Sequence, residues 1–337
     1  MRKVAIGVFG ITGGRHCQMS GLAETTIRAY EKAGYEFIAF FGFSGGAIVS
    51  ALMSSGIYKS EDGIQRWIES SSDYGKHGRI GSWSLPCNIW NLLRHGGLLN
   101  SASLYNKVFA KMFNDMDFKV PAFAGSWCTS HNVEILRDLT KGDAASAILC
   151  SAALPFAISP MKVLNKDLLD LGYGDLLPGI KDDLDGFSYF SDGGTSSALG
   201  VGVVDNTDLV ASLTQELGHP IPVIGINIDP INPGHDSGFG KYSWHKKIWE
   251  SGWGVVRANI RKDIEEARRE TKLQLCVAPT PKHLMKFSTK FDATIKENLA
   301  LYNTGCRQAE DWLSTPVDGY ENPVAALDAW YEQQWEK

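Results

Sequence analysis

Ser44 is the residue of this 337-residue chain whose surroundings best suit covalent chemistry. It lies in Gly42-Phe43-Ser44-Gly45-Gly46, between the apolar run 37–41 and the small-residue run 47–52. The first run is typical of a buried strand, and the second of a helix packed on a sheet. A serine on so sharp a turn is raised clear of the sheet, and the glycines beside it avoid side-chain clashes. The pattern predicts a nucleophile elbow. The plainer alternative is a glycine-rich turn with an incidental serine.

Asp192 is the acidic residue whose position could complement a serine nucleophile. It follows the strand-like run 187–191 and is followed by Gly193 and Gly194. The acid is therefore expected at the end of a strand, on a glycine turn. Taken alone, the motif is also explained by a plain Asp-Gly turn, which is the simpler interpretation.

The start of the chain predicts the elements that position these residues. An apolar strand at 4–9 leads into the glycine-bearing loop 10–16, and a helix is expected at 22–33 before the strand at 37. The order strand, helix, strand, helix implies two parallel strands of an open α/β sheet. Ligands bind beyond the carboxyl ends of such strands, so the loop and Ser44 are expected to be neighbours.

The remaining chain predicts a mixture of core elements and excursions. Residues 74–100 carry tryptophans and leucines with little charge, which suits either a lid or lipid-surface segment or ordinary packing. Ser101 or Ser103 is expected to cap the next helix, and an irregular insertion is expected at 161–186. A charged helix is predicted at 257–272, and a last helix starting at Asn322 and Pro323 either docks on the body or contacts a partner.

Composition excludes several classes of function. A net charge of −5 and a pI near 5.9 argue against a general nucleic-acid binder, which needs a basic surface. The six cysteines include no Cys-x-x-Cys pair, so reduced thiols and no metal site are expected. The amino-terminal apolar stretch is too short for a secretory signal, and both long uncharged runs are broken by glycine or proline. We expect a location that is cytoplasmic or peripheral to a membrane.

Four motifs in order resemble the patatin-like phospholipase family over roughly residues 3–313. They are the glycine-rich loop 10–15, the elbow at Ser44, the segment 150–155 (Cys-Ser-Ala-Ala-Leu-Pro) with Pro160 after it, and Asp192-Gly193-Gly194. The resemblance implies an α/β protein with a three-layer α/β/α fold and a mostly parallel sheet. We expect a catalytic domain at 1–313 and a helical extension at 314–337.

The resemblance also implies a lipid acyl hydrolase with a Ser-Asp dyad and no cofactor. Ser44 would form the acyl-enzyme and Asp192 would be the base, because a carboxylate in an apolar pocket can take a serine proton. The expected oxyanion and substrate contacts are Gly13, Gly14, Arg15 and Gly45. The implied partner is a phospholipid or another acyl-ester lipid, with transient contact to a membrane surface. The family's uninterrupted glycine triplet is broken here by Ile11 and Thr12, and its usual proline after the aspartate motif is missing.

Three alternatives stay open at this point. A triad esterase would need a histidine after the acid, for which His219, His235, His245 and His283 are available, but such folds place several strands before the nucleophile. An acyl-carrier transacylase also needs a histidine and has no use for the aspartate motif. An inactive lipid-binding or scaffold protein is disfavoured by the intact Ser44 and Asp192.

Overall fold

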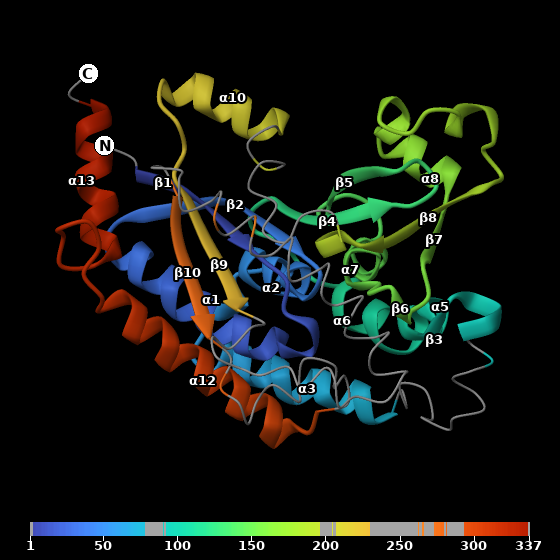
Figure 1. The fold of residues 1–337 in the computed structure, drawn as a ribbon, viewed down its shortest axis with the longest axis horizontal. Helices are drawn as coiled ribbons and strands as arrows, with labels where there is room; N and C mark the ends of the chain where they lie inside the picture. Colours follow the sequence, from blue (N-terminus) through green and yellow to red (C-terminus); the bar gives the residue numbers. More distant parts are fainter. Residues whose placement is uncertain are drawn as a thin grey trace, which may run out of the picture.

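The computed structural model describes residues 3–77, 92–195, 207–229, 273–279 and 293–335, with isolated positions between them. Its centre is an eight-stranded sheet in the order β10-β9-β1-β2-β4-β8-β7, with β5 paired to β4 (Figure 1). Five strands run parallel: β1 (Lys3–Phe9), β2 (Tyr35–Phe43), β4 (Ala122–Cys128), β9 (Val223–Asp229) and β10 (Leu273–Pro279). The other three run antiparallel to their neighbours: β5 (Val133–Asp138), β7 (Met161–Leu164) and β8 (Phe187–Asp192).

Helices cover both faces of the sheet, which confirms the three-layer α/β/α arrangement (Figure 1). Ala5, Phe9 and Phe40 point into one apolar core, while Ile6 and Phe41 point into the other, as expected for alternating strand residues. The first core is covered by α1 (His16–Lys32), α2 (Gly45–Ser54), α3 (Gly63–His77), α7 (Ala144–Ala152) and α12 (Ile295–Leu313). The second is covered by α10 (Asp208–Leu217).

The first βαβ unit has the parallel pairing that the sequence predicts. However, α1 begins at His16, six residues earlier than expected, because the loop passes through a 3-10 turn at Gly13–Arg15 straight into the helix. Gly21 lies in this added part of the helix. A Cβ atom on Gly21 would lie 2.1 Å from the backbone oxygen of Tyr302 on α12, so glycine lets the two helices cross closely.

Strand β4 brings two strand ends together. One edge of β4 pairs with β5 over residues 123–128. The other edge pairs with β2 over residues 122–125 and with β8 over residues 126–128. Since β2 runs parallel to β4 and β8 antiparallel, their carboxyl ends converge: Phe43 lies opposite Gly125, and Asp192 lies opposite Ser126. The residues after β2 and at the end of β8 must therefore be close in space.

The segment 161–186 is irregular only in its second half, whereas the sequence predicted an irregular insertion throughout. It contains β7, which forms an edge of the main sheet, and α8 (Asn165–Asp170). Leu168, Leu177 and Ile180 from this segment pack with Cys150 and Phe190 in a small apolar core. These short elements were missed because their apolar residues are few and separated by glycine and aspartate.

Other expectations differ from the structure or lie outside it. Asn100, and not Ser101 or Ser103, caps α5 (Ser101–Leu104), because its side chain accepts a hydrogen bond from the N–H of Ser103 at 3.0 Å. The helix continues through a π-helical turn at Tyr105–Phe109 into α6 (Ala110–Phe113). Several elements were not predicted, among them α10, β10 and α12. Most of the helix expected at 257–272, and Trp83 in the segment 74–100, lie outside the described residues.

The last helix, α13 (Pro323–Trp335), docks on the body of the protein. Its Tyr331 hydroxyl accepts a hydrogen bond from the N–H of Val4 at 3.0 Å. Asp328 accepts bonds from Lys3 Nζ at 2.7 Å and from the Tyr35 hydroxyl at 2.8 Å. Lys3, Val4 and Tyr35 begin β1 and β2, so α13 closes the end of the sheet opposite Ser44. Whether 314–337 is a separate extension stays a prediction.

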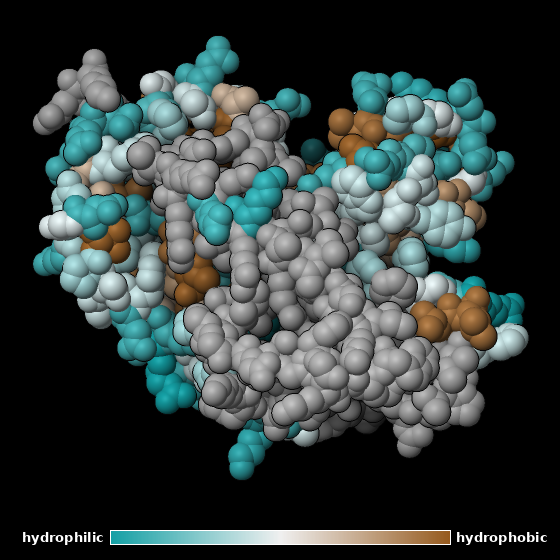
Figure 2. All heavy atoms as spheres, viewed as in Figure 1, coloured by the Kyte–Doolittle hydropathy of each residue, from teal (hydrophilic) through white to brown (hydrophobic). Residues whose placement is uncertain are grey.

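An apolar cluster is exposed beside β3 (Gly97–Leu99) and α5, at the edge of the molecule (Figure 2). Trp90 is 60% exposed and Leu93 is 79% exposed. Strand β3 pairs with β6 (Phe156–Ile158) in a separate two-stranded sheet. Within the described ranges, no helix is long and apolar enough to cross a membrane.

Candidate active site

Ser44 lies at the sharp corner between β2 and α2, as the elbow pattern predicts. Its backbone has φ 57° and ψ −130°, a conformation that residues with a side chain rarely adopt. The N–H of Ser44 donates to Ser151 Oγ at 2.9 Å, and its carbonyl accepts from the N–H of Ala47 at 3.0 Å. A Cβ atom on Gly42 would lie 2.2 Å from the backbone oxygen of Gly46, which explains this pair of glycines. The surrounding backbone thus holds Ser44 in a strained conformation.

Asp192 contacts Ser44 directly. Ser44 Oγ donates to Asp192 Oδ2 at 2.6 Å, and the N–H of Gly194 donates to Oδ1 at 2.8 Å. The N–H of Asp192 donates to the Ala153 carbonyl at 3.0 Å, which ties the end of β8 to the residue after α7. Only 1% of Asp192 and 4% of Ser44 are exposed.

The environment of Asp192 makes its carboxylate a stronger base than usual. Burial raises the pKa of Asp192 to about 7, because the charged form loses its hydration. The hydrogen bonds from Ser44 and Gly194 stabilise the carboxylate and oppose this rise in the pKa. Both protonation states are therefore populated near neutral pH, as general acid-base chemistry requires.

The loop 10–16 lies against the elbow, as predicted. A Cβ atom on Gly45 would lie 1.9 Å from Thr12 Oγ1, so the loop and the start of α2 are in direct contact. No described residue accepts a hydrogen bond from the N–H of Gly13, Gly14 or Gly45. The role of these three groups as oxyanion donors stays a prediction. The positive end of the α2 dipole lies at Gly45 and favours negative charge there.

Arg15 is buried, and its side chain bonds to the loop itself. Its Nε donates to the Thr12 carbonyl at 3.2 Å, and its backbone N–H donates to the same oxygen at 3.3 Å. Both bonds hold the turn that contains Gly13 and Gly14. Arg15 therefore braces this loop, and a direct contact between Arg15 and substrate stays a prediction.

Three described histidines, His16, His131 and His219, contact groups other than Ser44. His219 Nδ1 lies 2.8 Å from the Pro220 carbonyl, and its ring packs edge-on against Tyr331 at the far end of the sheet. His16 lies edge-on to Trp67, and burial lowers its pKa to about 4. His131 Nε2 lies 3.3 Å from Ser188 Oγ. The other three candidates, His235, His245 and His283, lie outside the described residues.

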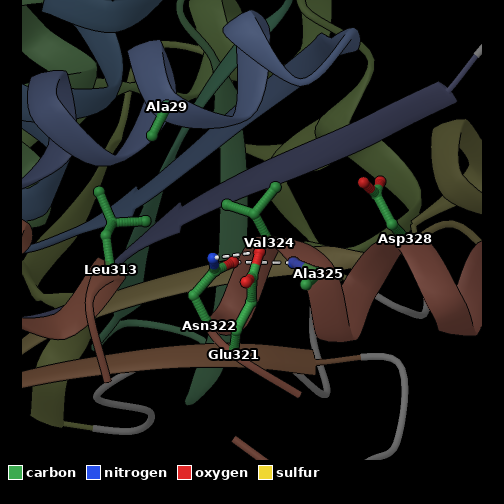
Figure 3. Close-up of a pocket in the computed structure, with 7 residues that line it drawn as sticks. All are labelled: Ala29, Leu313, Glu321, Asn322, Val324, Ala325 and Asp328. Atoms are coloured by element: carbon green, nitrogen blue, oxygen red, sulfur yellow. Dashed lines mark hydrogen bonds between the residues drawn. The ribbon is translucent and has the colours of Figure 1, made fainter. Parts of the chain in front are cut away.

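A separate hollow of about 310 Å³ lies where α13 meets α1 and the end of α12 (Figure 3). Figure 3 shows Val324 and Leu313 on its apolar side and the carboxylate of Asp328 at one margin. Asp328 bonds to Tyr35, at the start of β2, whereas Ser44 follows the end of this strand. A nine-residue strand is about 26 Å long from first to last residue. This hollow is therefore distinct from the Ser44 site.

Ser151 is a site residue to which the sequence analysis gave no role. It is fully buried, and its hydroxyl contacts the backbone of both Ser44 and Gly125. Its only sequence signal was its place in the motif at 150–155. No group of three or more potential metal ligands occurs among the residues that the structure describes.

Comparison with known proteins now gives the family. A model of the patatin-like phospholipase family matches residues 18–205, which is more than half of the chain. The chain belongs to the patatin-like phospholipase family. The matched part contains Ser44, Ser151 and Asp192, and it begins after the loop at Gly13 and Gly14. The family is one of lipid acyl hydrolases.

One solved structure similar to this patatin-like chain is that of VipD from Legionella pneumophila. The two share 10% sequence identity with a TM-score of 0.39, and the comparison covers 92% of this chain and 66% of VipD. The patatin-like chain thus spans slightly less than two thirds of VipD. No curated protein matches the sequence.

The raised pKa of Asp192 predicts a stability difference that depends on pH. An aspartate in the unfolded chain ionises near pH 4, whereas Asp192 in the folded protein holds its proton up to about pH 7. The contribution of Asp192 to wild-type stability should therefore fall between pH 4 and pH 7. Asp192→Asn has no carboxylate to ionise, so this contribution should not change with pH in the variant. We compare the free energies of unfolding of the two proteins at each pH. The value for Asp192→Asn, relative to that for wild type, should increase by up to about 4 kcal/mol from pH 4 to pH 7.

Urea unfolding of both proteins at several pH values measures this difference. The control is Ser44→Ala, which keeps the carboxylate and should lose at least as much stability with rising pH as wild type, because it lacks the hydrogen bond that lowers the pKa of Asp192. A difference between Asp192→Asn and wild type that stays constant from pH 4 to pH 8 would contradict the raised pKa.

Proposed function

We propose that this patatin-like protein is a phospholipase A or lysophospholipase, with Ser44 as nucleophile and Asp192 as base. The observation that carries the proposal is the 2.6 Å hydrogen bond from Ser44 Oγ to Asp192 Oδ2 in a buried site. A serine hydroxyl is a weak nucleophile until a base removes its proton. Asp192, with a pKa near 7, supplies that base without a histidine.

The reaction runs in two steps. Ser44 Oγ attacks the ester carbonyl carbon while Asp192 Oδ2 takes the hydroxyl proton, and collapse of the intermediate breaks the bond to the alcohol. Asp192 then gives its proton to the departing alkoxide, which leaves as the alcohol, here a lysophospholipid or a glycerol derivative. In the second step Asp192 takes a proton from water, whose oxygen attacks the carbonyl carbon of the acyl-enzyme. As the bond from this carbon to Ser44 Oγ breaks, Asp192 returns the proton to Ser44 Oγ and the fatty acid is released.

The oxyanion is stabilised by backbone groups in this proposal. The N–H groups of Gly45, Gly13 and Gly14 have no acceptor among the described residues and lie around the elbow. Such a donor typically contributes about a hundredfold to a thousandfold in rate. Arg15 supports the reaction indirectly, because its bonds to Thr12 fix the turn that presents Gly13 and Gly14.

The alternatives predict different chemistry at the same serine. A Ser-His esterase or acyltransferase needs an imidazole at Ser44 Oγ, a place that Asp192 takes in this structure. An inactive lipid-binding protein needs no base with a raised pKa. Water and a second alcohol compete for the same acyl-enzyme, so hydrolysis and acyl transfer differ only in which acceptor reaches it.

Contact with a lipid surface forms part of the proposal. The side chains of Trp90 and Leu93 are exposed, and the Arg94 guanidinium lies 5.8 Å from the Trp90 ring centroid. An aromatic ring and aliphatic side chains beside a basic group suit the boundary between lipid headgroups and acyl chains. This patch leads through β3 and β6 back to Ala153, whose carbonyl binds the N–H of Asp192.

Turnover of one soluble short-chain ester tests the dyad. Ser44→Ala and Asp192→Asn should each lower kcat by at least about a thousandfold, because one removes the nucleophile and the other cannot accept its proton. His219→Ala, His235→Ala, His245→Ala and His283→Ala should each stay within about tenfold of wild type. In wild type, kcat/KM should rise with pH to a plateau above about pH 7, as Asp192 loses its proton.

Asp328→Asn is the matched control, since it makes the same change in a carboxylate at the opposite end of the sheet. Circular dichroism checks the fold of every variant. A folded histidine variant as inactive as Ser44→Ala, together with a largely active Asp192→Asn, would replace the dyad by a triad.

The lipid-surface contact predicts a substrate-dependent loss. Trp90→Ser with Leu93→Ser should lower activity on phospholipid vesicles at least about tenfold and leave activity on the soluble ester within about twofold. The control is Leu176→Ser, because Leu176 is also exposed but lies in the segment 161–186, away from β3. Equal losses on vesicles and on the soluble ester would show that Trp90 and Leu93 stabilise the fold instead.

A further inference from the structure

We propose that Ser151 is a positioning residue that sets the place of the nucleophile. The assignment rests on the proposed function, because it gives Ser151 a role only through Ser44. Ser151 Oγ lies 2.9 Å from the backbone nitrogen of Ser44 and 2.6 Å from the backbone oxygen of Gly125. Its side chain comes from α7, so three elements meet at this one hydroxyl: α7, the elbow and β4.

The two contacts fix the direction of the Ser151 hydroxyl. A serine hydroxyl has one proton to donate and lone pairs to accept with. The Ser44 N–H can only donate and the Gly125 carbonyl can only accept, so the proton of Ser151 points to Gly125. All three groups are buried and satisfied. Loss of the hydroxyl would remove a hydrogen-bond partner from the buried Ser44 N–H and from the buried Gly125 carbonyl.

The hydrogen bond between Ser151 and the Ser44 N–H restrains a residue with a strained backbone. Ser44 has φ 57°, which is unfavourable for a residue with a Cβ atom and persists only where neighbours impose it. The bond from its N–H to Ser151 is one such neighbour contact. Without this bond the Ser44 backbone can relax, and Ser44 Oγ moves relative to Asp192 Oδ2. A small displacement of a nucleophile from its base lowers the rate strongly.

The same peptide of β4 also governs the position of the base. Gly125 precedes Ser126, which pairs with Asp192 across the sheet. A Cβ atom on Gly193 would lie 2.2 Å from the Gly125 oxygen, so the turn after Asp192 is pressed against this carbonyl. Ser151 therefore joins the nucleophile to the backbone segment that already positions the acid.

The link also decides which backbone groups can bind the oxyanion. The N–H of Ser44 is occupied by Ser151 and is not available to substrate. The donor at the elbow must then be the N–H of Gly45, which has no acceptor among the described residues. Ser151 thus orients two functions of the elbow, the nucleophile and the first oxyanion donor.

Steady-state kinetics on a soluble short-chain ester tests the assignment. Ser151→Ala should lower kcat about tenfold to a hundredfold with KM within about twofold, because the nucleophile moves while the substrate pocket is unchanged. Ser151→Thr keeps the hydroxyl and should restore kcat to within about threefold of wild type. The matched control is Ser50→Ala: Ser50 is equally buried and its hydroxyl also reaches β4, at the Phe123 carbonyl, but it does not bond to Ser44. Ser50→Ala should lower stability without lowering kcat.

The outcomes separate this inference from the proposed function. A folded Ser151→Ala with wild-type kcat, beside an inactive Ser44→Ala, would overturn the positioning role and leave the dyad standing. A loss of kcat in Ser50→Ala as large as that in Ser151→Ala would also overturn it, because any buried serine would then have the same effect. Activity in Ser44→Ala would overturn the proposed function itself. If Ser151→Ala does not fold, Ser151→Cys keeps the volume with weaker hydrogen bonds, and unchanged kcat in this variant would contradict the assignment.

Discussion

The end-to-end meeting of β2 and β8 on one edge of β4 is the constraint on which the site depends. Gly125 and Ser126 are consecutive residues of β4, and they pair with Phe43 and Asp192 respectively. Ser44, directly after β2, and Asp192, at the end of β8, must then lie close together. Backbone hydrogen bonds of the sheet, and not side-chain packing, bring the two residues together. This arrangement explains how residues 148 positions apart form a 2.6 Å hydrogen bond.

Burial of Asp192 makes its carboxylate a stronger base, and it also lowers the stability of the folded protein. Asp192 is nearly inaccessible, and this burial raises its pKa to about 7, which suits the role of base that we propose for it. Above this pH the buried charge lowers the free energy of unfolding relative to a neutral group. Ser44 adds a strained backbone conformation at the same place.

The sequence predicted the parts of the molecule in which local signals agree with the fold. The strand, corner and helix around Ser44 have glycine at positions where a side chain would clash, and Asp192 ends a strand on a glycine turn. The order of β4 pairings could not be read from the sequence, because no local pattern says that β2 and β8 share an edge. The role of Ser151 was missed for the same reason: its partners, Ser44 and Gly125, are distant in the chain. The helix α12 was missed although Thr294 and Glu297 form a capping box at its start.

Labelling with a fluorophosphonate ester, followed by mass spectrometry of the digested protein, tests the central claim most directly. The reagent reacts much faster with an activated serine hydroxyl than with an ordinary one, so the site and rate of the adduct report which residue is the nucleophile and what activates it. We predict a single adduct on Ser44, formed at a rate that rises with pH to a plateau above about pH 7, and no adduct in Asp192→Asn. An adduct on a different residue, or labelling of Ser44 at the wild-type rate in Asp192→Asn, would contradict the account.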